Sequence, residues 1–284
     1  EGRGFRLGFD PLKRRFLMSY GTSNIQLLPV LQALGIPDED IQKSWGKELY
    51  ASSLSSKKRG ELVKLSKSLN RFSDAKTDVE AVSVIKEMLG KTKLREDTTR
   101  ITLGTAFNKV TGDALLLTSQ KLLNINRGTD EVDNRDALQF KELWSISDHI
   151  PERIENSGRR ISYKMTNNLD RKDNIRSIIT ADIFNVPVKA FFTSTSLSQQ
   201  TSQVNPVDMV GGFLRTTIMG TGGIQSDAAI SDEAKLIDSS YLGFIDPVHT
   251  PEGKRSGISG HLSLGVKKKG TTPYIRVYDI KAGK

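Results

Sequence analysis

The residues most suggestive of a functional role lie in the run Pro247–Gly253, of sequence Pro-Val-His-Thr-Pro-Glu-Gly. A single acid, Glu252, stands between two residues that disfavour helix, and the cations Lys254 and Arg255 follow directly. Proline fixes its own backbone angle and glycine interrupts regular structure, so this run is predicted to be a rigid loop. Such a loop can hold one carboxylate and two cations at a fixed point, as a surface that tracks a charged polymer would.

A glycine-rich stretch, Gly220–Gly223, could cradle a phosphate with its backbone amides. A Walker loop requires a glycine, four residues and then Gly-Lys-Ser/Thr, because its lysine must reach the outer phosphates. The stretch has no such lysine, and the dinucleotide fingerprint fails at its third glycine. The sequence therefore favours a flexible surface loop here over a phosphate-binding loop.

No group of residues has the spacing of a metal site or a catalytic triad. The acids between positions 130 and 136 lack the alternate spacing and the sixth-position glycine of an EF-hand, so solvated turn acids are the favoured interpretation. The histidines lack the spacing of zinc ligands, and a local hydrogen bond is favoured for His249 over acid–base work. No Gly-x-Ser-x-Gly elbow occurs. We therefore predict no catalytic residue and no metal ligand in this chain.

Two basic features could contact an anion. Arg215 is surrounded in sequence by Leu214, Ile218 and Met219, so its charge is expected to face a partner, either a phosphate or a carboxylate. The run Lys267–Lys269 is followed by glycine, a pattern typical of a solvated hairpin turn. Arg215 is therefore the stronger candidate for a functional contact.

The composition is that of a globular protein with an excess of positive charge. The 284 residues are 36% hydrophobic with a mean hydropathy of −0.38, and no run of about 18 apolar residues suggests a transmembrane helix. The net charge of +9 favours a polyanionic partner without requiring one. The lack of cysteine excludes disulfides and cysteine nucleophiles. A start at Glu1, without an initiator methionine or a signal pattern, suggests an excerpt or a processed chain.

Hydrophobic periodicity and breaker residues predict an α+β fold with more than one domain. The predicted helices cover residues 25–34, 37–46, 57–72, 77–90, 118–125, 173–179 and 187–193. Thr77, with Glu80 three residues on, is predicted to form a capping box at the start of the fourth of these. The predicted strands cover residues 5–9, 16–20, 242–245, 261–266 and 274–278. The remaining long stretches are predicted to be a charged connection at 91–100 and loop over most of 211–240. A polar turn at 127–133 marks the first predicted domain boundary.

Several stretches together resemble the N-terminal half of the β subunit of multisubunit DNA-directed RNA polymerases. The most specific are Thr-Pro-Glu-Gly at 250–253, which is similar to the family's fork, and Leu-Ser-Gln-Gln at 197–200, which continues to Asn-Pro at 205–206. Further similar stretches are residues 4–11, 28–35, 127–138, 187–192, 214–216, 220–224 and 272–274. The likeness is weak between residues 40 and 120.

The resemblance implies three regions: a helical, lobe-like domain at 1–133, a mixed, protrusion-like segment at 134–194, and a β-rich, fork-like region with long loops at 195–284. It implies a part of a nucleotidyltransferase that holds downstream DNA and the RNA–DNA hybrid near the active centre. The family's magnesium motif, Asn-Ala-Asp-Phe-Asp-Gly-Asp, belongs to the other large subunit and does not occur here. The chain is therefore expected to hold no cofactor and to need partners: a β′-like subunit that binds Mg²⁺, a C-terminal β-like chain, the DNA template and the RNA transcript.

The resemblance also implies site residues. Those expected to contact nucleic acid, through phosphates rather than bases, are Gln199, Asn205, Arg215, Glu252 and Arg255. For Glu252 the alternative is that it braces its own loop. Those expected to form the fork loop that separates the strands are Gly220, Gly222, Gly223, Gln225 and Ser226.

This chain departs from the family where bacterial enzymes line their rifampicin pocket. The Asp, His and Ser positions of that pocket fall on Ser202, Gly212 and Thr217. These departures favour a divergent polymerase, with a large-bacteriophage enzyme as the first expectation and a divergent cellular enzyme as the second. In either case the enzyme is expected to act in the cytoplasm without contact to a membrane. Two other classes stay open: a stand-alone nucleic-acid-binding module, and a structural scaffold whose basic excess balances acidic partner subunits.

Overall fold

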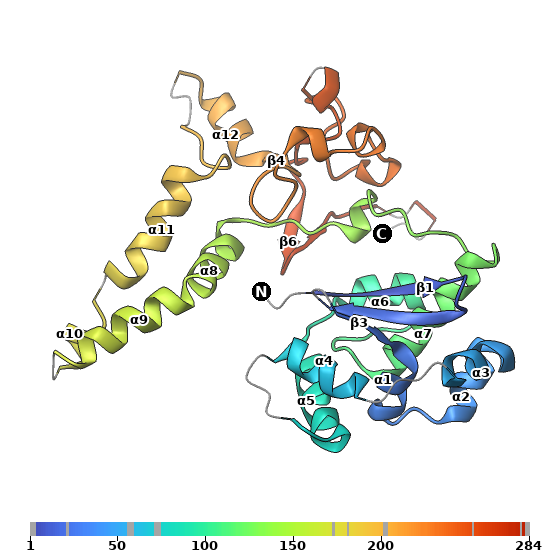
Figure 1. The fold of residues 1–284 in the computed structure, drawn as a ribbon. Coiled ribbons are helices and arrows are strands. Elements are labelled where there is room, and N and C mark those ends of the chain that lie inside the picture. Colours follow the sequence, from blue (N-terminus) through green and yellow to red (C-terminus); the bar gives the residue numbers. More distant parts are fainter. Residues whose placement is uncertain are drawn as a thin grey trace. The chain divides into compact units, whose positions relative to one another are not determined.

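The computed structural model describes residues 4–20, 23–55, 60–70, 75–171, 174–180, 182–200, 204–251, 253–278 and 280–281. The chain divides into two compact units, Glu1–Asp133 and Asn134–Lys284 (Figure 1). Each unit has its own core. No helix in the described ranges is both long enough and apolar enough to cross a membrane.

The first unit begins with an antiparallel three-stranded sheet in the order β1-β2-β3. β1 (Phe5–Asp10) and β2 (Arg15–Tyr20) are the two strands that the sequence predicts, and they pair with each other. β3 (Ser23–Gln26) occupies the start of a segment predicted to be helical. The helix after it therefore begins at Leu27 instead of Ile25.

Helices supply most of the core of the first unit, and several of them pack against this sheet. They are α1 (Leu27–Leu34), α2 (Asp38–Trp45), α3 (Lys47–Ser55), α4 (Glu61–Leu69), α5 (Asp78–Lys91), α6 (Glu96–Leu103) and α7 (Gly112–Asn126). The capping box predicted at the start of α5 is present, because the Glu80 amide donates to Thr77 Oγ1 at 3.4 Å. α6 replaces part of the predicted charged connection, so that prediction was wrong.

The core of the first unit is organised around Trp45, which is 1% exposed. Its ring centroid lies 4.8 Å from that of Phe16, and its Nε1 donates to Ser119 Oγ at 2.7 Å. The Ser119 hydroxyl donates in turn to the Leu116 carbonyl at 2.6 Å. The polar indole N–H is thus satisfied inside an apolar core, as a buried donor must be.

The second unit begins with a helical arm. Its helices are η1 (Leu138–Phe140), α8 (Ile146–Asn156), α9 (Gly158–Leu169), α10 (Ile175–Ile178), α11 (Asp182–Ser194) and α12 (Pro206–Leu214). α9 continues the direction of α8, and α11 packs back along both (Figure 1). The sequence predicted helices only at 173–179 and 187–193 in this region, because Pro151 and Gly158 disfavour helix and interrupt the apolar stripe. The described residues of 134–194 contain no strand, so this segment is helical rather than mixed.

Two short antiparallel ribbons follow the arm. β4 (Arg215–Thr217) pairs with β5 (Ser259–His261), and β6 (Lys267–Lys269) pairs with β7 (Thr272–Tyr274). Between β4 and β5 lie the 3-10 turns η2 (Asp227–Ala229), η3 (Glu233–Lys235), η4 (Ser239–Tyr241) and η5 (Gly253–Arg255). The α+β class is confirmed. The strands predicted at 242–245, 261–266 and 274–278 were misplaced, because ribbons this short depend on tertiary pairing more than on local β propensity.

Candidate nucleic-acid interface

The β4–β5 ribbon organises the predicted site residues. Arg215 pairs with His261 at one end of the ribbon, and Thr217 lies at the other end. The chain leaves Thr217 into the glycine loop, which comprises Gly220–Ser226, and it enters β5 from the turn that contains Arg255. The loop and this turn therefore emerge from one end, while Arg215 lies about 7 Å away at the other, since a strand rises about 3.4 Å per residue.

Arg215 and Gln199 are brought together at this ribbon. Arg215 Nη1 donates to Gln199 Oε1 at 3.0 Å, and both side chains are exposed. In the part of the chain that the structure describes, the guanidinium is oriented by this amide and has no carboxylate partner. A guanidinium carries five N–H donors, so most of them stay available for phosphate oxygens. The pair is therefore suited to bind a phosphate at a fixed position.

Asn205 lies away from this pair. Its Oδ1 accepts from the Val207 amide at 3.0 Å and caps α12. Arg215 follows the opposite end of that helix. A helix of this length separates the two residues by roughly 13 Å, at a rise of about 1.5 Å per residue. Asn205 thus has a structural task, and its contact with nucleic acid stays a prediction.

The loop that leads to the Thr-Pro-Glu-Gly motif is anchored at its start. Asp246 Oδ1 accepts from the amides of Val248 at 2.9 Å and His249 at 3.4 Å. The hydrogen bond from Val248 is the main reason that the pKa of Asp246 is lowered, with smaller contributions from His249 and His261. The His249 and His261 rings stack with centroids 3.7 Å apart, and His261 Nδ1 lies 3.1 Å from the His249 carbonyl oxygen. The predicted site residue Glu252 lies outside the described residues.

Arg255 ends η5, and its side chain is exposed. Its carbonyl accepts from the Ile258 amide at 3.1 Å, and the Gly257 amide donates to the Lys235 carbonyl at 2.8 Å. A Cβ added at Gly257 would lie 2.4 Å from a backbone oxygen, so this close approach requires glycine. The turn thus fixes the backbone from which Arg255 projects.

The glycine loop is closed by its own backbone. The amides of Gly223 and Ile224 donate to the carbonyls of Gly220 at 3.0 Å and Ile218 at 2.9 Å. Gly220 and Gly222 have φ values of 97° and 84°, which favour glycine. A Cβ at Gly223 would lie 2.1 Å from the Ile218 carbonyl oxygen. The loop is thus a compact, internally bonded turn instead of the flexible surface loop that the sequence favoured.

Gln225 and Ser226 complete the loop and are exposed. Gln225 Nε2 donates to the Gly220 carbonyl at 3.4 Å, and Ser226 Oγ accepts from the Ala228 amide at 3.3 Å. The small core of the second unit includes residues at both ends of the loop, and its members are Ile218, Met219, Ile224, Ile230, Ala234 and Ile258. The loop is followed by η2, a turn of three residues. This is too short for the helix N-terminus that a phosphate loop uses.

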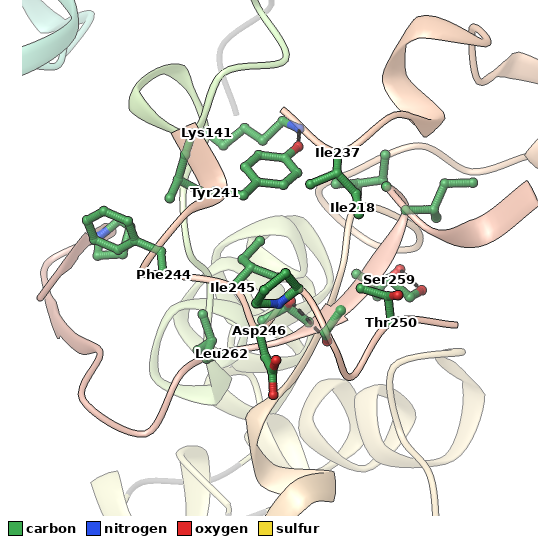
Figure 2. Close-up of a pocket in the computed structure, with 18 of the residues that line it drawn as sticks. Lys141, Ile218, Ile237, Tyr241, Phe244, Ile245, Asp246, Thr250, Ser259 and Leu262 are labelled. Atoms are coloured by element: carbon green, nitrogen blue, oxygen red, sulfur yellow. Dashed lines mark hydrogen bonds between the residues drawn. The ribbon is translucent and has the colours of Figure 1, made fainter. Parts of the chain in front are cut away.

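An apolar cavity of about 110 Å³ adjoins the ribbon (Figure 2). Ile218, Ile237 and Ile245 contribute to its lining. The Tyr241 hydroxyl accepts a hydrogen bond from Lys141 Nζ and donates to the Asp136 carbonyl at 3.2 Å. The cavity lining is chiefly apolar, in contrast to the exposed pair of Gln199 and Arg215.

The lysine run of β6 contains one structural residue. Lys268 Nζ donates to Ser145 Oγ at 2.7 Å and forms an ion pair with Asp148 at the start of α8. Lys267 and Lys269 are exposed, because successive side chains of a strand point to opposite faces. The prediction of a solvated run was therefore wrong for Lys268.

Two family models match this chain. Residues 1–144, half of the chain, match the model described as RNA polymerase Rpb2, domain 2. The chain belongs to the RNA polymerase Rpb2 family. Residues 199–267 match a second model of this family, RNA polymerase Rpb2, domain 3, and this segment contains Gln199, Arg215, the glycine loop and Arg255.

Members of this family with similar sequences are named DNA-directed RNA polymerase subunit beta. The protein of Adiantum capillus-veneris is 25% identical over 308 residues, which cover 98% of this chain and 29% of the relative. That of Mycoplasma mycoides subsp. mycoides is 29% identical over 222 residues, 74% of this chain and 17% of the relative. The protein of Phaeodactylum tricornutum is 28% identical over 179 residues, which cover 62% of this chain and 13% of the relative. The predicted resemblance to the β subunit is confirmed, and the chain spans between 13% and 29% of the length of these relatives.

Proposed function

We propose that this chain forms part of a β subunit of a DNA-directed RNA polymerase and holds downstream DNA and the RNA–DNA hybrid near the active centre. Nucleotidyl transfer would then require partners, namely a β′-like subunit and a C-terminal β-like chain. In the described residues no group of three or more His, Asp or Glu side chains could hold a metal ion. From the resemblance, whose magnesium motif belongs to the other large subunit, we expect the catalytic Mg²⁺ on the β′-like partner.

The observation that carries this proposal is the Gln199–Arg215 pair. The guanidinium is exposed, held by an amide at 3.0 Å, and without a carboxylate partner in the described residues. It lies in the segment that matches the Rpb2 domain 3 model. A charge presented in this way suits a phosphate, and phosphate contacts fix the register of a duplex without reading its sequence. A processive polymerase needs that kind of grip.

The other predicted residues take roles around this pair. Arg255 would contact a second phosphate from the opposite end of the ribbon. Asn205 and Glu252 would contact the hybrid or the downstream edge, and the glycine loop would part the strands at the fork. The compactness of the loop supports this last role, because a wedge between base pairs must keep its shape.

The place of action is part of the same proposal. We expect the assembled enzyme in the cytoplasm, and in the host cytoplasm if a bacteriophage encodes it. Ser202, Gly212 and Thr217 stand where bacterial enzymes have the Asp, His and Ser of the rifampicin pocket, and these differences support a divergent source. A large-phage origin stays a prediction.

The salt dependence of elongation-complex stability tests this function. Arg215→Ala and Arg255→Ala should each weaken the complex, and each should reduce the slope of log stability against log salt by about one charge. Sequence preference should not change, because phosphates are the same at every base. Lys269→Ala is the matched control, since Lys269 is an exposed cation of the same unit.

Two results would count against the proposal. If Lys269→Ala lowered the salt slope as much as Arg215→Ala and Arg255→Ala, the nucleic-acid track would lie on a different face. If all three variants bound nucleic acid normally and the chain bound it without partners, a stand-alone binding module would explain the protein better.

A further inference from the structure

A buried aromatic cluster lies where α8 and α11 meet the glycine loop. Its centre is His149, which is 7% exposed. The His149 ring lies between Trp144, at a centroid distance of 5.2 Å, and Phe191, at 5.3 Å. These rings come from the segment before α8, from α8 itself and from α11, so the cluster fastens the two helices to each other.

Arg153 extends from this cluster to the loop. Its Nη2 donates to Thr221 Oγ1 at 2.7 Å, and its guanidinium carbon lies 5.9 Å from the centroid of the Phe191 ring. Arg153 Nε is buried without a hydrogen-bond partner in the described residues. Leaving a buried N–H of a charged group unpaired costs free energy. The hydrogen bond to Thr221 and the contact with the Phe191 ring hold the arginine in place despite this cost.

The loop backbone passes near the cluster at Gly222. A Cβ built at Gly222 would lie 3.8 Å from the Trp144 ring and 4.0 Å from the His149 ring, which is ordinary contact distance. Thr221 precedes this glycine, so the hydrogen bond from Arg153 acts on the residue next to this close approach. The backbone hydrogen bonds described above fix the internal shape of the loop. The hydrogen bond from Arg153 to Thr221 holds its orientation against the helical arm.

We propose that Arg153 is a positioning residue that orients the glycine loop for strand separation by holding Thr221 from α8. The inference rests on the proposed function only in the task assigned to the loop. The orienting contact itself follows from the geometry. Because α8 also packs on α11, a shift of either helix would be passed to the loop through this hydrogen bond.

The hydrogen bond can be removed with little change in shape. Thr221→Val keeps the size of the side chain and loses the acceptor, whereas Thr221→Ser keeps the hydroxyl. Arg153→Met removes the donor and keeps an apolar stem. The amides to follow by hydrogen exchange are those of Gly223 and Ile224, whose hydrogen bonds close the loop.

The exchange experiment uses the complex that the full chain forms with its partner subunits on a DNA–RNA scaffold. Thr221→Val and Arg153→Met should each speed loop exchange roughly tenfold, the effect of losing one hydrogen bond to a charged donor. Thr221→Ser should restore wild-type exchange. The double variant should exchange no faster than either single one, because both remove the same contact. If Thr221→Val, with α8 exchange unchanged, left loop exchange at the wild-type rate, the positioning role would be overturned.

A second readout separates this inference from the proposed function. A 2-aminopurine base placed at the downstream fork reports by fluorescence where the strands part. A changed fluorescence profile in Thr221→Val, restored in Thr221→Ser, would support both the positioning role and the task of the loop. Faster loop exchange with an unchanged fluorescence profile would uphold the orienting contact and overturn the strand-separating task.

Discussion

Replacing Lys268 with alanine should loosen the start of α8. The Lys268 ammonium donates to Ser145 Oγ at 2.7 Å and pairs with the Asp148 carboxylate, which also accepts from the Ser145 amide at 2.8 Å. The side chains of Lys268 and Asp148 are 21% and 23% exposed. This pair therefore closes the capping box of α8 from a strand far along the chain.

The exposure of the pair sets the expected magnitude. Exposed ion pairs contribute about 0.2–1 kcal/mol, and breaking a fully buried pair costs about 3–5 kcal/mol. A pair that is roughly four-fifths buried lies between these limits, so Lys268→Ala should cost about 1–3 kcal/mol. A tenfold change in an equilibrium constant corresponds to about 1.4 kcal/mol, so the amides of the first turns of α8 should exchange roughly 5- to 150-fold faster.

The effect should depend on pH in a defined direction. Burial raises the pKa of Asp148, but the hydrogen bonds from Lys268 and Ser145 outweigh it and leave the pKa below the usual 3.8. A carboxylate with a lowered pKa contributes stability that is present above its unfolded pKa and is lost as pH falls through the folded pKa. The difference between wild type and Lys268→Ala should therefore be full near neutral pH and vanish in strong acid.

Hydrogen exchange measured by mass spectrometry on wild type, Lys268→Ala and Lys269→Ala provides the assay. Lys269 lies on the same strand with an exposed side chain, so its variant controls for the loss of one charge. Equal protection of α8 in the two variants would refute the reasoning, because the ion pair would then contribute nothing beyond a surface charge.

Further predictions concern a buried imidazole, the glycine loop and a drug. Burial lowers the pKa of His149 below the usual 6.5, so the unfolded state binds more protons. Thermal stability should fall as pH drops from about 7 to 5.5, and His149→Gln should flatten this fall. Gly223→Ala would place a Cβ 2.1 Å from the Ile218 carbonyl oxygen and should destabilise the loop by about 1–3 kcal/mol, whereas Gly212→Ala, with open space, should not. The assembled enzyme should transcribe at rifampicin concentrations that stop a bacterial polymerase. Ser202 and Gly212 offer neither carboxylate nor imidazole to the drug, and each lost hydrogen bond should weaken its binding by about 1–3 kcal/mol. Equal inhibition in a transcription assay would contradict this.

Local signals in the sequence predicted the parts of the fold that depend on neighbouring residues. The β1–β2 pair and the capping box at Thr77 depend on contacts within a few positions, so composition and spacing reveal them. α8 and α9 were missed because Pro151 and Gly158 oppose helix locally, and packing on α11 overrides that preference.

The contacts around the candidate site were hidden for a related reason. Arg153 and Thr221 are 68 positions apart, and Lys268 and Asp148 are 120 positions apart. A single sequence contains no periodicity that would join such residues, since tertiary folding alone brings them together. Arg215 could be singled out because a cation among apolar neighbours stands out locally, but its partner Gln199 could not be paired with it.

Affinity purification of the tagged chain from the cells that make it tests the central claim most directly. If the chain is part of an RNA polymerase, a β′-like subunit with the acidic magnesium motif should co-purify, and the complex should synthesise RNA on a DNA template. The separated chain should then aggregate, because its strands and loops would lack their neighbours. A stable monomer that unfolds cooperatively, binds no partner subunit and supports no RNA synthesis would contradict the account.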